Sequence, residues 1–557
     1  MSDVTEERGT VSRRNVLKMA AATGALTALG PGASRAQLHQ GSAPQYDVVI
    51  VGGGSAGAVL ARRLSENSSR RVLLLEAGKA YAPPAYPDPV RLQSIIGGDA
   101  AHNWNYSSLP SFIGRSISVP RGKVLGGSSA INGAVAMRAP KSDFERWARE
   151  YKLQGWTWDA LTPAFQRAER TSAGPAALHG RSGPFPIHQL GFEEMSDMQR
   201  AFVDAAVSAG FPRVADFNGR EPFGAGPYPM NTRMGNRLNT GMTYLDTDTR
   251  ARPNLTIRGS REVDSVILEG GRAVGVRLLG GEEVRAGEVV LCGGTYGSPA
   301  ILMRSGIGPA DELRRLRIDV IADLPVGRRL QDHPFYFTVW AGTKSKMNLG
   351  IPPVGAILWA RTKMAAPDDL DLHVVPAHYG DPASSPTGAI FVMGIANTRP
   401  ASIGSFKLKS RDPRVTPLID FAFLKENRDR ESLVDGIELA RHLAATKPLS
   451  EFVHGEMSPG PAADSRAKIE ASLAATLDTY HHPTATVPMG GDHDSTAVVD
   501  DQGRVRGIQH LRVVDASILP DVPSVATNVT TIWPNATRQN CPLKRAPPSY
   551  ALSDGEG

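Results

Sequence analysis

The chain has 557 residues, of which 41% are hydrophobic and 21% charged, a composition typical of globular proteins that fold in water. The net charge of +6 is small for this length, and no dense basic run with interleaved aromatics is present, which argues against nucleic-acid binding. After residue 36 no apolar run reaches the roughly 20 residues that span a bilayer. The two cysteines, Cys292 and Cys541, lack metal-ligand spacing, so we predict no metal site, while a disulfide between them stays open.

The N-terminal residues have the pattern of an export signal. Arg13 and Arg14 precede a weakly apolar run, Met19 to Gly30, and the small-residue pattern Ala33-Ser-Arg-Ala36 follows. This resembles a twin-arginine (Tat) signal peptide over residues 1–36, which predicts a periplasmic or secreted protein. The alternative is a basic tail before an alanine-rich helix.

The segment from Asp47 to Gly78 predicts a dinucleotide site. An apolar run, Val48 to Val51, is typical of a buried parallel strand, and Gly52, Gly54 and Gly57 follow in G-x-G-x-x-G spacing. A helical run and a second strand, Val72 to Leu75, come next, and Glu76 lies 19 residues after Gly57. The glycines permit a tight turn, close approach of a pyrophosphate and close helix packing, and the acid can bind ribose hydroxyls. The alternative, an ordinary βαβ turn, needs only the glycines.

Two further glycine-rich segments follow. Gly126 to Ser129 cannot form a good helix or strand and predicts a loop where backbone lies against a ligand. Glu288 to Cys292 is predicted to be a buried strand, with Cys292 a small buried hydrophobe. After it, the pattern predicts a helix over 298–304 with Ser298 as its cap and Pro299 in its first position. Each glycine turn alone could be structural.

Taken together, these segments resemble a known family. Gly122-Lys-Val-Leu-Gly-Gly-Ser-Ser-Ala-Ile-Asn132 and the segment from Gly294 to Gly308 are similar to the two signature motifs of the glucose–methanol–choline (GMC) oxidoreductases. Val326 to Pro334 resembles the loop after the second signature, and Leu511 to Ser517 resembles a late flavin-contacting strand. The resemblance covers nearly all of the chain after residue 46, apart from about the last 20 residues.

The resemblance implies an α/β fold with an α+β substrate part. The Rossmann-like FAD-binding domain is assembled from several chain segments, with its main part at residues 46–340 and a return at 476–537. Residues 341–475 are expected to form a substrate-binding domain with a mostly antiparallel, six-stranded sheet. Short β-rich runs (370–375, 389–395 and 405–408) and a helical pattern around 430–444 fit that domain.

The family binds FAD, so the resemblance implies that FAD is the dinucleotide. It places the cofactor against residues of several segments: Gly52, Gly54, Ser55, Ala56, Gly57, Glu76, Ala77, Gly126, Ser128, Asn132, Gly133, Ala134, Val135, Val263, Asp515 and Ala516. In one branch of the family a histidine of the first signature carries a covalent bond to the flavin. Ile131 occupies that position here, which implies non-covalent FAD.

The chemistry is predicted near the C-terminus. Alcohol oxidation needs a base for the hydroxyl proton, and the flavin N5 accepts the hydride. His482 matches the family's catalytic histidine in the H-P-x-x-T pattern, and Asn528 matches the partner that positions the alkoxide. The family therefore implies oxidation of a small-molecule alcohol to an aldehyde or ketone, with O2 or a quinone- or cytochrome-type acceptor reoxidising the flavin.

Three alternatives accompany this assignment. His482 could be an ordinary packed histidine; its neighbour His481 competes for the role, and we expect a strand there to turn only one of the two toward the flavin. We expect His102, His179, His333 and His510 to be structural or exposed. The same residues would also serve a hydroxynitrile-lyase-like enzyme that keeps FAD without net redox, or, less readily, a non-catalytic flavoprotein.

The chain departs from the family pattern after Asn528. Pro534 is expected to break or kink the last helix early, and the family's glutamate is absent there, so the flavin edge near Asn528 could differ in shape. Residues 538–557 carry Pro, Ser and Gly and are predicted to be a disordered tail.

Overall fold

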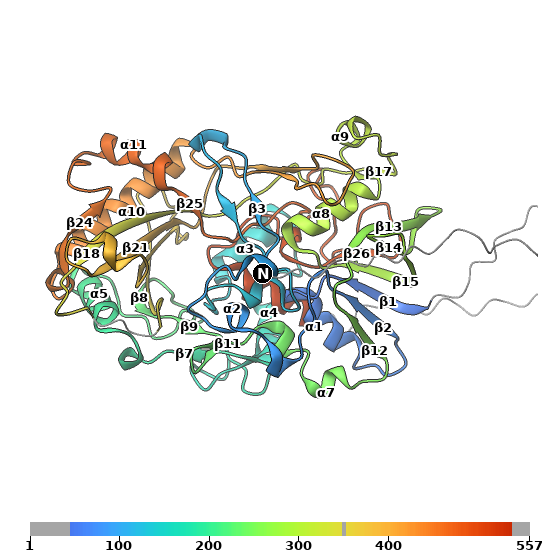
Figure 1. Ribbon diagram of the computed structural model, residues 1–557, viewed down its shortest axis with the longest axis horizontal. Helices are drawn as coiled ribbons and strands as arrows, with labels where there is room; N and C mark the ends of the chain where they lie inside the picture. The colour runs from blue at the N-terminus through green and yellow to red at the C-terminus, as the bar shows by residue number, and fades with distance from the viewer. Residues whose placement is uncertain (1–44, 348–351, 537–557) are drawn as a thin grey trace, which may run out of the picture. The chain divides into compact units, whose positions relative to one another are not determined.

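The glycine-rich segment lies in the first of two sheets. The computed structural model describes residues 45–347 and 352–536 (Figure 1). The sheet has the order β12-β2-β1-β15-β14-β13, with β26 also paired to β15. Its strands are β1 (Tyr46–Val51), β2 (Val72–Leu75), β12 (Leu255–Arg258), β13 (Val263–Glu269), β14 (Arg272–Leu278), β15 (Glu283–Leu291) and β26 (Leu511–Val513). The pairs β12–β2, β2–β1, β1–β15 and β15–β26 are parallel, whereas β13, β14 and β15 pair antiparallel.

The two predicted strands of the glycine segment are confirmed. Val48–Val51 falls within β1, and Val72–Leu75 is β2, buried along its whole length because helices and neighbouring strands cover it. Between them α1 (Ser55–Leu64) packs through its small residues. A Cβ on Gly57 would lie 1.9 Å from the carbonyl oxygen of Gly52, so this close packing of helix on turn requires glycine.

The second sheet is antiparallel throughout and confirms the fold expected for the substrate part. It has the order β24-β18-β21-β20-β19-β8, with the two-residue β25 paired to β18. Its strands are β8 (Gly224–Pro227), β18 (Pro334–Gly342), β19 (Ala356–Ala360), β20 (Leu372–Ala377), β21 (Ile390–Asn397), β24 (Val453–Ser458) and β25 (Asp478–Thr479). In Figure 1 it lies at the end away from the first sheet.

Helices cover one face of the second sheet and leave the other face to the site. Helix α10 (Asn427–Ala445) packs on β20 and β21, where a Cβ on Gly436 would meet Ile395 and Leu372. Alternate residues of the strands, such as Val375 on β20 and Gly394 on β21, face the opposite way. The run at Ser405–Lys407 forms β22, which pairs with β23 (Leu418–Asp420) outside this sheet.

The remaining elements connect the two sheets. The helices are α2 (Asp88–Arg91), α3 (Lys141–Glu150), α4 (Trp158–Ala168), α5 (Asp197–Ser208), α6 (Thr240–Thr243), α7 (Thr247–Arg250), α8 (Gly294–Arg304), α9 (Ala310–Arg315), α11 (Arg466–Thr476) and α12 (Thr527–Ala536). Two-residue strands are β3 (Tyr106–Ser107), β4 (Ser118–Val119), β5 (Glu169–Arg170), β6 (Phe185–Pro186), β7 (His188–Gln189), β9 (Pro229–Met230), β10 (Thr232–Arg233), β11 (Asn236–Arg237), β16 (Ile307–Gly308) and β17 (Ala322–Asp323).

The expected loop at 126–129 is a glycine turn that contains one 3-10 turn, from Gly127 to Ala130. Two other local expectations were wrong. Helix α8 begins at Gly294 and not at Ser298, whose hydroxyl donates to Asp515 and accepts from the Gly293 amide. Helix α12 continues through Pro534 to Ala536, because a single proline removes only one backbone hydrogen bond near a helix end.

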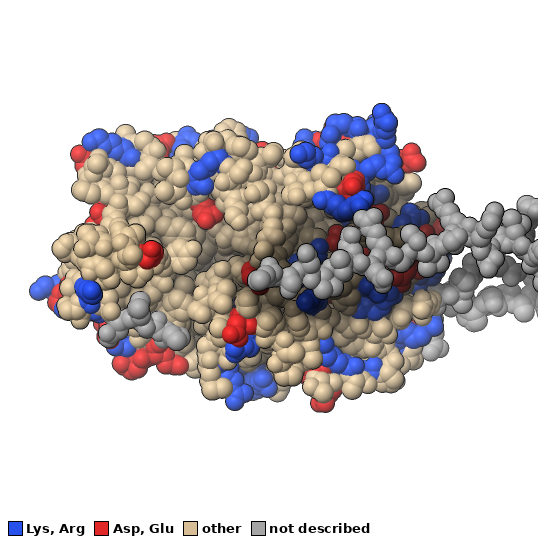
Figure 2. All heavy atoms as spheres, in the orientation of Figure 1, with Lys and Arg blue, Asp and Glu red and all other residues tan. Residues whose placement is uncertain are grey.

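The surface and the domain limits carry less information about function. On the face shown in Figure 2, basic side chains gather over the region of α9, where Arg315 and Arg328 form ion pairs with Glu312 and Asp311.

Within the described ranges, no helix combines the length and the apolar character needed to cross a membrane. The limits 46–340, 341–475 and 476–537 stay predictions. The Tat segment, Cys541 and residues 538–557 lie outside the described residues.

Candidate active site

A single large cavity collects nearly all the predicted site residues. It has a volume of about 1120 Å³ and is lined by residues of both sheets and of the loops between them. Two predicted residues, Gly57 and Gly126, do not line it. The others do: Gly52, Gly54, Ser55, Ala56, Glu76, Ala77, Ser128, Asn132, Gly133, Ala134, Val135, Val263, His482, Asp515, Ala516 and Asn528.

The glycines of the first motif have separate local roles. Gly52 has φ +99°, and a Cβ there would lie 2.4 Å from the carbonyl oxygen of Cys292. Gly54 has room toward the protein, since its Cβ would meet only Gly127 Cα at 3.6 Å, and it borders the cavity. No side chain caps the start of α1, so its first amides face the cavity without competition from a capping group.

Glu76 closes this end of the cavity. Its carboxylate accepts hydrogen bonds from the amides of Gly53 at 2.7 Å and Gly78 at 2.8 Å, which fix its orientation. Burial raises the pKa of Glu76 to about 7, although the two amides and Lys123 act against the shift. An oriented carboxyl at the end of β2 can hold ribose hydroxyls.

The two signatures support the middle of the cavity through their own hydrogen bonds. The hydroxyl of Ser128 accepts from the Gly122 amide, and Asn132 Oδ1 accepts from the Ala134 amide at 3.0 Å. Asp515, just after β26, accepts from the Gly294 amide at 2.8 Å and from Ser298 Oγ at 2.6 Å. This carboxylate therefore ties the start of α8 to the late strand.

Proline in α8 connects the second signature to the histidine loop. Pro299 has no N–H to donate to the carbonyl of Thr295, four residues earlier. That carbonyl instead accepts a 2.7 Å hydrogen bond from the hydroxyl of Thr486, and Thr295 Oγ1 donates to the carbonyl of Pro483 at 2.7 Å. The threonine and proline of H-P-x-x-T therefore hold the loop of His482 against α8.

His482 lies beside a second histidine that the sequence did not assign to the site. The Nδ1 atoms of His333 and His482 are 3.0 Å apart; His333 is fully buried, and His482 is partly buried where it borders the cavity. His333 precedes β18, in the loop after the second signature. We expected His333 to be structural or exposed; it is fully buried, and pairing of β18 with β25 brings its chain segment beside that of His482.

Buried Asp332 holds the backbone of both histidines. It accepts from the amide of His333 at 2.7 Å, the amide of His482 at 2.8 Å and Oγ1 of Thr479 at 2.6 Å. Burial raises the pKa of Asp332 to about 6, against the attraction of Arg121 and the three donors. A single carboxyl thus places the two rings relative to one another.

Burial keeps both imidazoles neutral. It is the largest cause lowering the pKa of His333 to about 3, and it also lowers the pKa of His482 well below its usual value. The charges of His333, His481, Arg121 and His373 lower the pKa of His482 further. At neutral pH His482 therefore has a free lone pair and can accept a proton.

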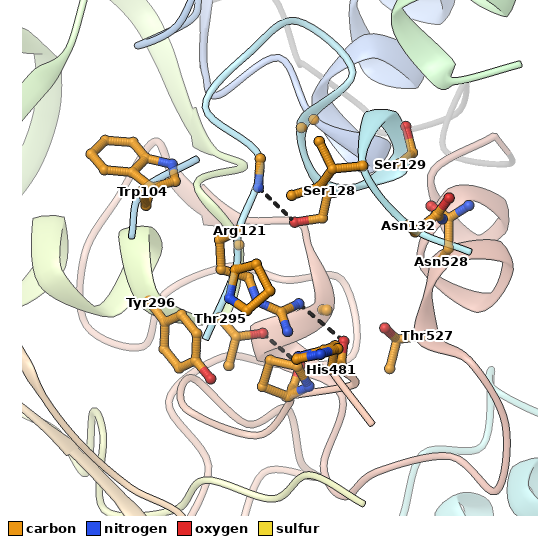
Figure 3. Close-up of a pocket in the computed structure, with 18 of the residues that line it drawn as sticks. Trp104, Arg121, Ser128, Ser129, Asn132, Thr295, Tyr296, His481, Thr527 and Asn528 are labelled. Atoms are coloured by element: carbon orange, nitrogen blue, oxygen red, sulfur yellow. Dashed lines mark hydrogen bonds between the residues drawn. The ribbon is translucent and has the colours of Figure 1, made fainter. Parts of the chain in front are cut away.

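His481 also lines the cavity, so the expected alternation of a strand was wrong. β25 ends at Thr479, and His481 has φ +66°, which turns the chain before His482. The carbonyl of His481 accepts from Arg121 Nη1 at 3.0 Å, a contact visible in Figure 3. Both His481 and His482 border the cavity, so this position does not identify the candidate base. The contact with His333 distinguishes His482 from His481.

Asn528 lies in the first turn of α12. Its Oδ1 accepts from Ser55 Oγ at 2.7 Å, which links it to the start of α1, whereas the Nδ2 group is buried with no hydrogen-bond partner among the described residues. Figure 3 shows Asn528 among the residues that line the cavity. A buried amide donor that borders a cavity can bind an oxygen of a ligand there.

A buried ionic network supports the loop that leads to Asn528. Asp521 accepts from both ends of the Arg146 guanidinium at 2.8 and 3.1 Å and from the Trp147 indole at 2.5 Å. Asp143 accepts from the amide and hydroxyl of Ser524. These contacts anchor residues 521–524 to α3, and the position of α12 follows.

Arg121 is a second residue that the sequence did not assign. It extends into the cavity in Figure 3, and its Nε and Nη2 atoms are buried without a partner in the described part of the chain. Arginine just before a glycine-rich loop gives a weak sequence signal. A buried guanidinium with free donors fits an anionic or carbonyl-bearing ligand.

These observations fit FAD. The cavity offers a carboxyl for a ribose, a glycine turn with helix amides for a pyrophosphate, and buried donors on Arg121 and Asn528 for carbonyl or phosphate oxygens.

Comparison with known proteins agrees with this assignment. Profiles of the GMC oxidoreductases match residues 46–335 and 400–533. The chain belongs to the GMC oxidoreductase family. It is therefore an FAD-dependent oxidoreductase that acts on alcohols, and the predicted family, fold class and cofactor are confirmed. A twin-arginine translocation signal profile also matches residues 10–30.

Relatives resemble this chain over almost its whole length. The oxygen-dependent choline dehydrogenase of Stenotrophomonas maltophilia (strain R551-3) is 35% identical and covers 92% of this chain and 98% of its own. The mitochondrial choline dehydrogenase of Mus musculus is also 35% identical, covering 90% of each chain. Among solved structures, pyridoxine 4-oxidase from Mesorbium loti is 32% identical with a TM-score of 0.81, and covers 89% of this chain and 99% of its own.

Proposed function

We propose that this oxidoreductase converts a primary or secondary alcohol to an aldehyde or ketone, with His482 as the base that takes the hydroxyl proton. The observation that carries the proposal is the neutral imidazole of His482, held at 3.0 Å from His333 and bordering the same cavity as the FAD-binding glycines. General-base catalysis of this kind contributes about 100-fold to 10,000-fold in rate.

The histidine contact supports an assignment of the base to one nitrogen of His482. The two Nδ1 atoms are 3.0 Å apart, so one of them must donate and the other accept, and we propose that His482 is the donor. His333 Nδ1 then accepts from Nδ1–H of His482, and the lone pair of His482 lies on Nε2. The base atom is therefore Nε2, and His333 acts as a positioning residue.

Asn528 supplies the second interaction with the substrate oxygen. Its Oδ1 is bonded to Ser55, so Nδ2–H remains to donate to the alkoxide that forms as the proton leaves. Removal of the proton by His482 and donation from Asn528 together stabilise negative charge on that oxygen.

The FAD site is proposed to extend from Glu76 to Asn528. Glu76 and Ala77 would hold the ribose, Gly52, Gly54 and the first amides of α1 the pyrophosphate, and the loop 132–135 the ring. When bound, FAD accepts the hydride from the alcohol carbon. Ile131 carries no group that could bond to the flavin, which supports non-covalent binding.

The later steps and the location are also proposals. Either O2 or a quinone- or cytochrome-type acceptor would take the electrons from the reduced enzyme. The twin-arginine signal supports a periplasmic or secreted protein that binds FAD before export. Replacing Arg13 and Arg14 by lysine should leave the protein in the cytoplasm, which fractionation would detect.

Anaerobic mixing of the FAD-loaded protein with a panel of alcohols tests the proposed reaction. Loss of the visible flavin absorbance, with formation of an aldehyde or ketone, is the expected result. Cleavage of a cyanohydrin without loss of absorbance would contradict the oxidation and favour the lyase.

A further inference from the structure

The part of the cavity next to His482 is bounded by aromatic rings. We call these residues the aromatic wall: Tyr228, Phe335, Phe337, Tyr379 and Tyr480. They come from β18 and from the segments that follow β8, β20 and β25, and none of them belongs to the first sheet.

The wall is continuous from His482 outward. The ring centroids of Tyr480 and His482 are 4.6 Å apart, and Tyr480 stacks on Phe335 at 4.2 Å with an interplanar angle of 24°. Phe335 meets Phe337 edge-on at 4.5 Å, and Phe337 stacks with Tyr379 at 6.0 Å. A substituent on an alcohol carbon at His482 would therefore lie against ring faces and edges.

Small residues in β21 leave space for this stack. A Cβ on Gly394 would lie 2.3 Å from the ring of Phe335, so the ring rests directly on the strand backbone. Val375 and Val392 fill the neighbouring positions. The surface next to His482 is consequently formed largely by aromatic rings and small apolar residues.

The wall carries no charge that would attract a cation. Burial raises the pKa of Tyr480 to about 12 and holds the pKa of Tyr228 well above its ordinary value, so both side chains are neutral. Asp478 lies two residues before Tyr480 and is the acidic residue nearest to the wall in sequence. Burial raises the pKa of Asp478, although the charge of Arg115 acts against this shift. The other acidic residues of the cavity lining, Glu76, Glu262 and Asp515, lie beside the first sheet.

The desolvation that keeps the histidines neutral would act on a cationic substrate as well. Burial is the largest cause lowering the pKa values of His333, His373 and His482. A quaternary ammonium placed among them would lose its hydration without gaining an ionised carboxylate. Aromatic faces alone can attract such a group, which makes choline the natural competitor for a test.

We infer that the aromatic wall selects an uncharged, flat substrate, an aryl-methanol type of alcohol, over a quaternary ammonium alcohol. This inference rests on the proposed function, because it takes the alcohol carbon to lie at His482.

The test uses two matched pairs of alcohols with the FAD-loaded enzyme. Benzyl alcohol and cyclohexylmethanol differ in the aromaticity of their ring. Choline has a charged quaternary nitrogen where neohexyl alcohol has an uncharged quaternary carbon. We expect kcat/KM for benzyl alcohol to exceed that for cyclohexylmethanol by about tenfold. The kcat/KM for neohexyl alcohol should exceed that for choline by about a hundredfold. A preference for choline over neohexyl alcohol would overturn the inference.

Variants assign the selectivity to the wall. Phe335→Leu should reduce the benzyl over cyclohexyl preference to about threefold or less. Phe391→Leu is the matched control, since Phe391 is buried in β21 but stacks on Trp340 on the other face. If Phe335→Leu does not fold, Phe337→Leu, which is only partly buried, gives the same comparison. An unchanged preference in the variant that folds would contradict the role of the wall.

Binding separates this inference from the proposed reaction. Each alcohol is titrated into the oxidised enzyme without O2, and perturbation of the flavin spectrum gives its dissociation constant. Tighter binding of benzyl alcohol than of choline with no loss of flavin absorbance would contradict the reaction and retain the substrate class. Turnover with choline as the preferred alcohol would support the reaction and contradict the substrate class. If benzyl alcohol does not bind, the inference is overturned.

Discussion

The two sheets contribute to the cavity in different ways. The first sheet presents backbone: a glycine at φ +99°, free amides at the start of α1, and a carboxyl held by two amides. The second presents side chains: a stack of aromatic rings, and behind His482 the buried histidine that precedes β18. Backbone recognition tolerates little change in sequence, whereas a wall of side chains can change its chemistry by substitution. This difference explains how one family can keep one cofactor while accepting different alcohols.

Gly54→Val should produce the largest effect. Its Cβ has room toward Gly127, so the protein should fold, but the side chain would enter the proposed pyrophosphate site and prevent FAD binding. We expect colourless protein with a near-normal melting temperature. Gly57→Val is the control, because its Cβ would lie 1.9 Å from a backbone oxygen and should prevent folding instead. Yellow Gly54→Val protein would show that this turn does not hold the cofactor.

His482→Ala tests the side-chain region. The variant should keep FAD and lower kcat by about a hundredfold or more, because the base for the hydroxyl proton is lost. Single-turnover reduction of the flavin measures this step directly. His481 also borders the cavity, and its variant His481→Ala should lower kcat much less. Equal losses of kcat in the two variants would contradict the assignment of the base.

Glu76→Gln tests the first region by its pH dependence. The pKa of Glu76 in the folded protein, about 7, lies above its ordinary value, so its contribution to stability is complete below about pH 4.5 and is lost as the pH rises through 7. The unfolding free energy of the FAD-free protein should therefore fall by on the order of 3 kcal/mol across that range because of this group. In the glutamine variant this part of the slope should disappear, as chemical denaturation at several pH values would show.

His333→Leu should have the smallest effect and tests the proposed tautomer. Without an acceptor at Nδ1, His482 should lose about tenfold in kcat with little change in KM. The lost contact would also have stabilised protonated His482, so the pKa of His482 should fall and the acid limb of the rate profile should move to lower pH. His333→Gln keeps an acceptor and should recover most of the rate. Equal losses in both variants, with an unmoved profile, would indicate a structural role alone.

Local patterns predicted much of the first region correctly. The strands at 48–51 and 72–75 and the helix between them depend on neighbours in the sequence, and their order already indicated a dinucleotide site. The start of α8 was predicted four residues late, because the hydroxyl of Ser298 is bound by Asp515, more than 200 residues away. The strand expected around His481 was wrong for a similar reason: a positive φ, which no pattern of hydrophobic residues indicates, turns the chain there.

The sequence by itself determined the cofactor and the family, since glycine spacing, a following acid and two signature motifs act through short stretches of backbone. Only the tertiary structure placed His333 beside His482, aimed Arg121 into the cavity and assembled the aromatic wall. These groups lie on segments far apart in the chain, and strand pairing such as β18 with β25 brings them together. Their protonation and selectivity depend on burial and on neighbours across the fold, so they become visible only once the chain is packed.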